Sequence, residues 1–167
     1  MKKTYVTLLI VLIMLVTSSI AYASPAAESD NFAVPLSGRE EVPARDTGAT
    51  GVATFKLSED GTELSYKLIV ANIQGVTQAH IHCGAAGVNG PVVAFLYGFN
   101  PAGVTANGVL AMGTIRAANV IPRPDSPECP GGVANFDDML AKIRSGDAYV
   151  NVHTLMFPGG VIRGQFE

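Results

Sequence analysis

The sequence has few of the residues on which catalytic and nucleic-acid sites depend. Its 167 residues include only three histidines and two cysteines, and lysine plus arginine (11) are outnumbered by aspartate plus glutamate (14). The absence of a basic run or stripe argues against a nucleic acid or an anionic membrane surface as a partner. There is no Gly-x-Ser-x-Gly motif, no serine or cysteine placed beside a histidine and an acid, and no glycine-rich phosphate loop. Nucleophilic catalysis and phosphate binding therefore have no support.

The N-terminal segment has the organisation of a secretory signal peptide. Lys2 and Lys3 precede an apolar run over residues 5–16, and Ala21-Tyr22-Ala23 is typical of a cleavage site. We predict cleavage after Ala23, so that residues 1–23 are the signal peptide and residues 24–30 a flexible leader. The alternative is an uncleaved anchor, for which the apolar run is short. The mature protein is predicted to be secreted, periplasmic or at the cell surface, with no membrane association after cleavage.

Residues 31–167 are predicted to form one domain with an all-β fold. Short apolar runs alternate with turn signals, and no internal repeat or second core is visible. Asp60-Gly61 indicates a tight hairpin between two alternating runs. About seven to nine strands are typical of an antiparallel immunoglobulin-like sandwich or barrel. The predicted strands are 32–36, 51–57, 63–70, 76–83, 91–97, 109–116, 148–154 and 161–166, with a turn at 72–75.

One short helix is predicted at residues 136–144. Asn135 precedes it as an N-cap, acidic residues lie in its first turn and basic residues in its last turn, which matches the helix dipole. Gly146 is predicted to end it.

Cys83 and Cys129 are predicted to form a disulfide, because exported proteins occupy oxidising compartments. Chain-entropy arithmetic gives such a crosslink about 4 kcal/mol of stabilisation. The alternatives are two free thiols, or Cys83 as a metal ligand.

The three histidines lie in two short motifs. His80 and His82 are two residues apart on a predicted strand, so both side chains leave the same face, whereas Ile81 and Cys83 leave the other. His153 follows Tyr149 and Asn151 on the same face of a later strand. If the isoleucine and valine residues face the core, all three histidines lie on the outer face. Three imidazoles suit copper or zinc; the alternative is a hydrogen-bonded polar cluster beneath a glycine-rich loop.

These motifs closely resemble the CHRD domain, a family named for the chordin module. The resemblance is carried by His80-Ile81-His82, 89–93 and 149–154, and extends to 36–38, 41–43, 50–51 and 162–165. It covers residues 31–167 and implies an all-β, immunoglobulin-like or barrel fold, of the single-domain secreted microbial type. For microbial members it implies no established activity. Val161 stands where many members are expected to have an acidic residue.

Glu41 and Arg163 occupy motif positions as well. We predict a buried ion pair that ties the N-terminal loop to the last strand, with a ligand site as the alternative. Met156 is a conceivable soft copper ligand, although strand parity places it on the wrong face.

The sequence therefore predicts an exported CHRD-domain binding protein that holds one copper or zinc ion through His80, His82 and His153, with an extracellular protein as a conceivable further partner. One alternative is a copper redox enzyme, for superoxide dismutation or electron transfer. Its arrangement would resemble that of copper/zinc superoxide dismutase, but three histidines cannot build that enzyme's two-metal site. Another alternative is a metal-free structural or adhesive module.

Overall fold

The computed structural model describes residues 31–167. The predicted signal peptide and leader lie outside the described residues. Within residues 31–167, no helix is both long enough and apolar enough to cross a bilayer.

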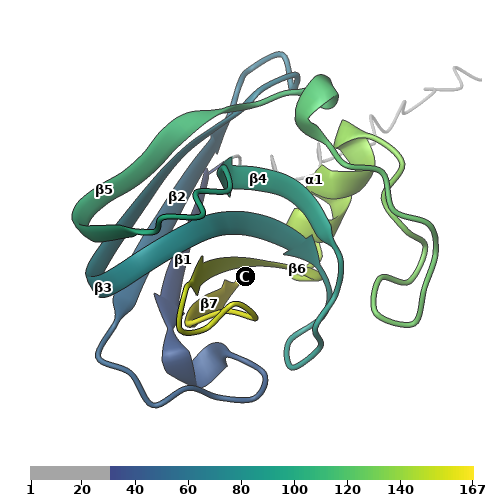
Figure 1. Cartoon of the computed structure of the whole chain (residues 1–167). Coiled ribbons are helices and arrows are strands. Elements are labelled where there is room, and N and C mark those ends of the chain that lie inside the picture. The colour runs from purple at the N-terminus through teal and green to yellow at the C-terminus, as the bar shows by residue number, and fades with distance from the viewer. Residues whose placement is uncertain (1–30) are drawn as a thin grey trace, which may run out of the picture.

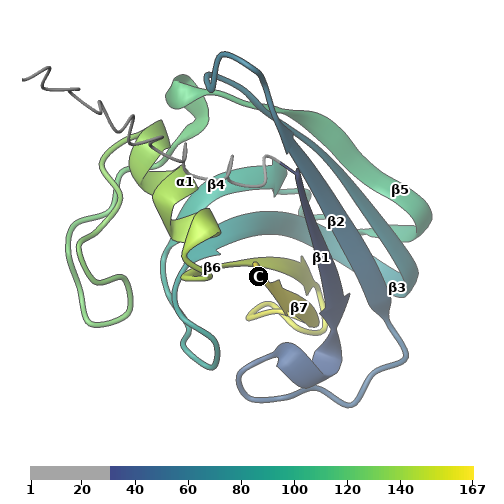
Figure 2. The ribbon, with the colours of Figure 1, turned by 180° about the vertical axis from the view of Figure 1, so that it is seen from behind.

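The described chain forms one antiparallel sheet whose strands curl around a common core (Figures 1 and 2). Five strands close on one another in the order β1-β2-β3-β6-β7, and β4 and β5 extend the sheet from the other edge of β3. The prediction of an antiparallel all-β fold with one short helix is confirmed, and the closed part is a five-stranded barrel. The strands are β1 (Asn31–Ser37), β2 (Thr50–Leu57), β3 (Leu64–Cys83), β4 (Val92–Tyr97), β5 (Val104–Ile115), β6 (Ala148–Thr154) and β7 (Ile162–Gln165).

Strand β3 organises the fold, because four other strands pair with it. Its first half pairs with β2 and β5, and its second half with β6 and β4. The predicted turn at 72–75 is wrong, since the strand runs on through Asn72 and Gly75. Both residues have positive φ (55° and 65°), and the pairing with β5 shifts register around them. They bend the strand without ending it, because hydrogen bonds to its neighbours continue on both sides of the bend.

The barrel interior is a continuous apolar core. The hairpin predicted from Asp60-Gly61 joins β2 to β3. Alternating residues of these two strands point into the core, where they pack against apolar residues of β6 and β7. The largest fully buried apolar side chains of this core include Leu64, Leu68, Ile81, Ile162 and Phe166.

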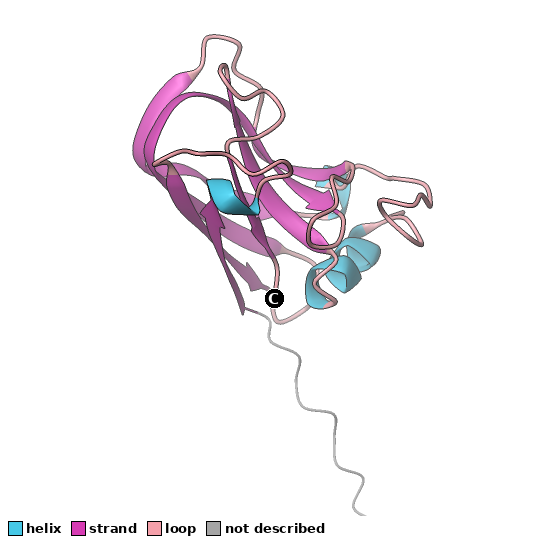
Figure 3. Ribbon diagram, turned by 90° about the horizontal axis from the view of Figure 1, so that it is seen from below, coloured by secondary structure: helices cyan, strands magenta, loops and turns pink. Residues whose placement is uncertain are grey.

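The helix α1 (Phe136–Arg144) has the predicted bounds. The Asn135 side chain accepts a hydrogen bond from the Asp138 amide, which caps its first turn. Its buried residues join the main core, and Figure 3 shows it at one end of the strands. Two short 3-10 helices, η1 (Gly38–Glu40) and η2 (Ala117–Asn119), lie in the connecting segments.

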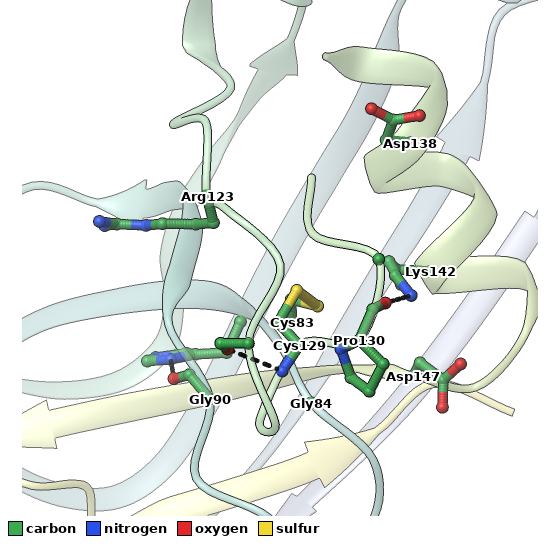
Figure 4. The surroundings of a disulfide bond; sticks show 12 residues. Cys83, Gly84, Gly90, Arg123, Cys129, Pro130, Asp138, Lys142 and Asp147 are labelled. Atoms are coloured by element: carbon green, nitrogen blue, oxygen red, sulfur yellow. Dashed lines mark hydrogen bonds between the residues drawn. A yellow bond between two sulfur atoms is a disulfide. The ribbon is translucent and has the colours of Figure 1, made fainter. Parts of the chain in front are cut away.

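The long connection before α1 is tied to the end of β3 by the Cys83–Cys129 disulfide (Figure 4). The Cα atoms are 5.4 Å apart, and the bridge spans 46 residues of sequence. Lys142 of α1 donates a hydrogen bond of 2.6 Å to the carbonyl of Pro130, beside the bridge. The predicted pairing is thus present, and Cys83 is not a metal ligand.

Candidate metal centre

The three histidines come together where β3 pairs with β6. In this register His80 lies opposite Asn151, and His153 lies opposite Gln78. One nitrogen from each imidazole can be chosen so that all three atoms lie within 4.8 Å of one another. Two sequence motifs about seventy residues apart therefore contribute to one cluster, because antiparallel pairing places them side by side.

The histidines are buried, which corrects the prediction that they lie on an outer face. The exposed fractions of His80, His82 and His153 are 3%, 8% and 6%. Strand parity was right in one respect, since Ile81 and Val150 on the opposite face belong to the barrel core. The histidine face is nevertheless shielded from water, because loop segments contact it through backbone carbonyls. Sequence alternation identifies the two faces of a strand but does not show what covers each one.

Backbone carbonyls fix the tautomers of two histidines. The Nδ1 atom of His82 lies 2.9 Å from the oxygen of Gly90, and Nδ1 of His153 lies 2.8 Å from the oxygen of Pro158. A carbonyl can only accept a hydrogen bond, so both Nδ1 atoms carry the proton. In the neutral rings, the lone pairs at Nε2 are then available. This is the arrangement that orients histidine ligands in metal sites.

The third ring completes the cluster. His80 Nδ1 lies 3.0 Å from Nε2 of His153. Without a metal, this contact is a hydrogen bond from His80. Two nitrogens bound to one ion also approach to about 3.3 Å, given metal–nitrogen distances of about 2.0 Å and tetrahedral angles. The Nε2 atoms of His80 and His82 are buried and have no hydrogen-bond partner.

Burial keeps the imidazoles neutral. Desolvation, with smaller contributions from neighbouring charges, lowers the pKa of His80 to about 3 and that of His82 to about 4. It also lowers the pKa of His153, against the opposing effect of the Pro158 hydrogen bond. Neutral rings are the form that binds metal ions.

Two aromatic rings line the cluster. Tyr149 stacks on His82, with ring centroids 4.7 Å apart and an interplanar angle of 7°. Phe95 contacts His80 edge-on at 4.5 Å. Phe95 lies opposite His80 in the β3–β4 pairing and is 45% exposed.

Glu41 reaches this region from the N-terminal loop. Its carboxylate accepts a 2.9 Å hydrogen bond from Asn151, and only 5% of the residue is exposed. Desolvation raises the pKa of Glu41 to about 7, although the nearby charges of Arg163 and Arg45 oppose the shift. Asn151 and Glu41 together lie where a side chain on Gly160 would project.

Arg163 is fully buried but does not form the predicted ion pair. Its guanidinium group donates hydrogen bonds to Ala85 O (3.1 Å), Asn89 Oδ1 (3.3 Å) and Gln165 Oε1 (3.2 Å). It also lies over the ring of Tyr149, 3.5 Å from the centroid. Glu41 acts on it only through a longer-range Coulomb interaction. Arg163 therefore connects β7 to the loop 84–91, because the shortest of its three hydrogen bonds is to the backbone oxygen of Ala85 in that loop.

Some parts of the cluster had no sequence signal. The carbonyls of Gly90 and Pro158 belong to the backbone, so no side-chain pattern could mark them. Asn89 belongs to one of the motifs, but its spacing gave no sign that its side-chain amide donates a 2.7 Å hydrogen bond to Val42 O. Met156, which strand parity had placed on the wrong face for a copper ligand, is 79% exposed, whereas the histidines are buried.

Comparison with known families and structures agrees with the motif resemblance. The family model described as CHRD domain matches residues 32–166, nearly all of the described chain. No curated protein and no solved structure matches the sequence.

Proposed function

The chain belongs to the CHRD domain family, and we propose that this member is an exported binding protein that holds a single copper or zinc ion through His80, His82 and His153. The proposal rests on one observation. One nitrogen from each of three buried imidazoles lies within 4.8 Å of the other two, and in two of the rings a backbone carbonyl holds the proton on Nδ1, which leaves the Nε2 lone pair to bind an ion.

The electrostatics favour this role over a purely structural cluster. A structural cluster would satisfy its buried nitrogens internally, because an unpaired buried polar atom costs about 1–3 kcal/mol. Here the Nε2 atoms of His80 and His82 have no partner in the protein. An ion bound by the three rings would supply the missing contact at Nε2 of His82. If Nδ1 of His80 is the ligand, the proton of that ring would move from Nδ1 to Nε2.

Binding is proposed rather than catalysis because the cluster is enclosed. Five surface cavities of residues 31–167, of about 90 to 540 Å³, are lined by other residues and by none of the histidines. The exposed fractions of the three histidines, 3%, 8% and 6%, leave little of each ring open to a substrate. A redox enzyme at the same residues is the alternative that an activity assay for superoxide consumption tests.

The decisive experiment is elemental analysis of the purified mature protein after loading with copper or zinc and removal of excess ion. We expect one ion per chain in the wild type, and a loss of at least about tenfold in affinity for His80→Ala and for His153→Ala. Lys67→Ala is the matched control, since Lys67 is exposed on the same strand β3. Wild-type protein that retains no ion after loading would refute the proposal.

A further inference from the structure

We infer that the ion held by this cluster is monovalent copper, Cu(I), rather than a divalent ion. The inference rests on the proposed function above and narrows it to one ion and one oxidation state. Three features of the cluster support it: the charge and number of its ligands, the charges around it, and its enclosure.

The ligand set is neutral and three-membered. Within residues 31–167, no carboxylate or thiolate joins the group formed by His80, His82 and His153. Cys83 follows His82 directly, but its sulfur is bonded to Cys129. Zinc sites are almost always four-coordinate, and Cu(II) favours tetragonal coordination. Cu(I) has a filled d shell and accepts three ligands in a plane, so three imidazoles satisfy it.

The surroundings are unfavourable to a second positive charge. Arg163 and Arg123 both act on His82 through positive charge. The nearby acid, Glu41, has a pKa raised to about 7 by burial, so it is a weak counter-charge near neutral pH. The Born cost of burying an ion grows with the square of its charge, and it is about fourfold greater for a dication than for a monocation. A buried, neutral ligand set therefore discriminates in favour of Cu(I).

The burial of the cluster also disfavours a water molecule as an additional ligand of a divalent ion. A zinc ion with three histidine ligands commonly completes its coordination with water. The cavity of about 490 Å³ beside the loop 84–91 is lined by Asn89, Gly90 and Arg123, but by no histidine. The ring of Tyr149 and that of Phe95 lie against His82 and His80. These rings and the low exposure of the three histidines leave little room for water as a fourth ligand.

The test compares two ions on the mature chain with its disulfide intact. Cu(I) affinity is measured anaerobically by competition with a chromophoric Cu(I) chelator, and Zn(II) affinity with a zinc chelator at the same pH. We expect one Cu(I) per chain, an X-ray absorption spectrum of three-coordinate copper with nitrogen ligands, and zinc binding weaker by at least about a hundredfold. Cu(I) binding is expected to be lost in His80→Ala and His153→Ala.

The outcomes separate this inference from the proposed function. Histidine-dependent zinc binding as tight as that of Cu(I) would overturn the Cu(I) assignment and leave the metal-binding proposal standing. Failure to bind either ion would overturn both. Cu(I) binding that persists when all three histidines are replaced by alanine would also overturn both, because the ion would lie elsewhere.

A charge variant tests the physical reason. Asn151 lies opposite His80, is buried in the same region and donates a hydrogen bond to Glu41. Asn151→Asp is therefore made and compared in a Glu41→Gln background, in which the amide at position 41 can donate to the new carboxylate and one negative charge is added beside the cluster. We expect the ratio of Zn(II) to Cu(I) affinity to rise by at least about tenfold. Asn107→Asp is the control, because Asn107 is exposed on β5 and the substitution changes charge equally. An unchanged ratio in folded Asn151→Asp would contradict the inference.

Discussion

At the residue scale, burial decides how the polar side chains of this protein behave. Three histidines that would titrate near neutrality in water are held neutral, because desolvation lowers the pKa of each. A single glutamate in the same region has its pKa raised for the same reason. The two effects have opposite consequences for the pH dependence of stability, which makes them separable.

The histidines are expected to make the metal-free protein acid-sensitive. Their folded pKa values lie below the unfolded value of 6.5, so the unfolded state binds more protons. Their contribution to the free energy of unfolding is fully present above pH 6.5 and is lost as pH falls toward 4, by up to about 1.4 kcal/mol per pH unit for each group. The free energy of unfolding is measured by urea titration between about pH 4 and pH 6.5, with a chelator present to keep the protein free of metal. His82→Gln removes one titrating group and is expected to show a shallower decline; an identical slope would contradict the prediction.

Glu41 is expected to act in the opposite direction. Its folded pKa, about 7, lies above the ordinary value of 4.5, so its contribution to stability is present below pH 4.5 and is lost as pH rises through 7. We expect the free energy of unfolding of Glu41→Gln, relative to that of the wild type, to be higher at about pH 8.5 than at about pH 5. Paired urea titrations at the two pH values measure the difference. A stability difference independent of pH would show that the carboxyl is not desolvated.

At the element scale, three loops hold the cluster from outside the barrel. The loop after η1 contacts both of the others: Val42 O accepts a hydrogen bond from Asn89, next to Gly90, and Glu41 packs against Gly160, close to Pro158. Gly90 and Pro158 are the residues whose carbonyls orient His82 and His153. The N-terminal loop therefore contacts both loops whose carbonyls orient His82 and His153, two of the proposed metal ligands.

The closest packing in these loops is at Gly160. Its φ is 123°, and a Cβ there would collide with Asn151 and Glu41. We expect Gly160→Ala to destabilise the protein by about 1–3 kcal/mol and to weaken metal binding, because the carbonyl of Pro158 moves with the loop. Gly159→Ala is the matched control, since a Cβ at Gly159 would meet no atom within 4 Å. Urea unfolding and metal competition measure both variants, and equal behaviour of the two would contradict this role for the loop.

At the scale of the whole molecule, the barrel supports the histidine cluster, and the N-terminal sequence predicts export. Four strands pair with β3, and the disulfide fixes its end next to His82. The backbone of His80 and His82 is therefore fixed by the hydrogen bonds of β3 with its neighbouring strands. Cleavage after Ala23 is predicted to leave a mature chain without Lys2 and Lys3, with 9 basic and 14 acidic residues and a formal charge of −5.

Export is tested on the full-length chain in a secreting host. We expect the secreted protein to begin at Ser24, because Ala21-Tyr22-Ala23 directs cleavage after Ala23. Intact-mass analysis of the secreted fraction gives the mature N-terminus. Replacing Ala21 and Ala23 with bulky residues is expected to block processing. Protein that retains residues 1–23 in the wild type would support an anchor instead.

Much of the fold was determined by local sequence. The hairpin at Asp60-Gly61, the helix capped by Asn135 and the division of Ile81 from His80 and His82 all follow from periodicity and turn chemistry, which depend on neighbouring residues. Only the tertiary structure decided that β3 continues through Asn72 and Gly75, because the hydrogen bonds that keep it a strand come from distant segments. The same holds for the centre. The sequence selected its three histidines, but their burial, their tautomers and the separation of Glu41 from Arg163 depend on loops that pack across the sheet. Alternation marks the two faces of a strand; tertiary packing determines whether each one meets water.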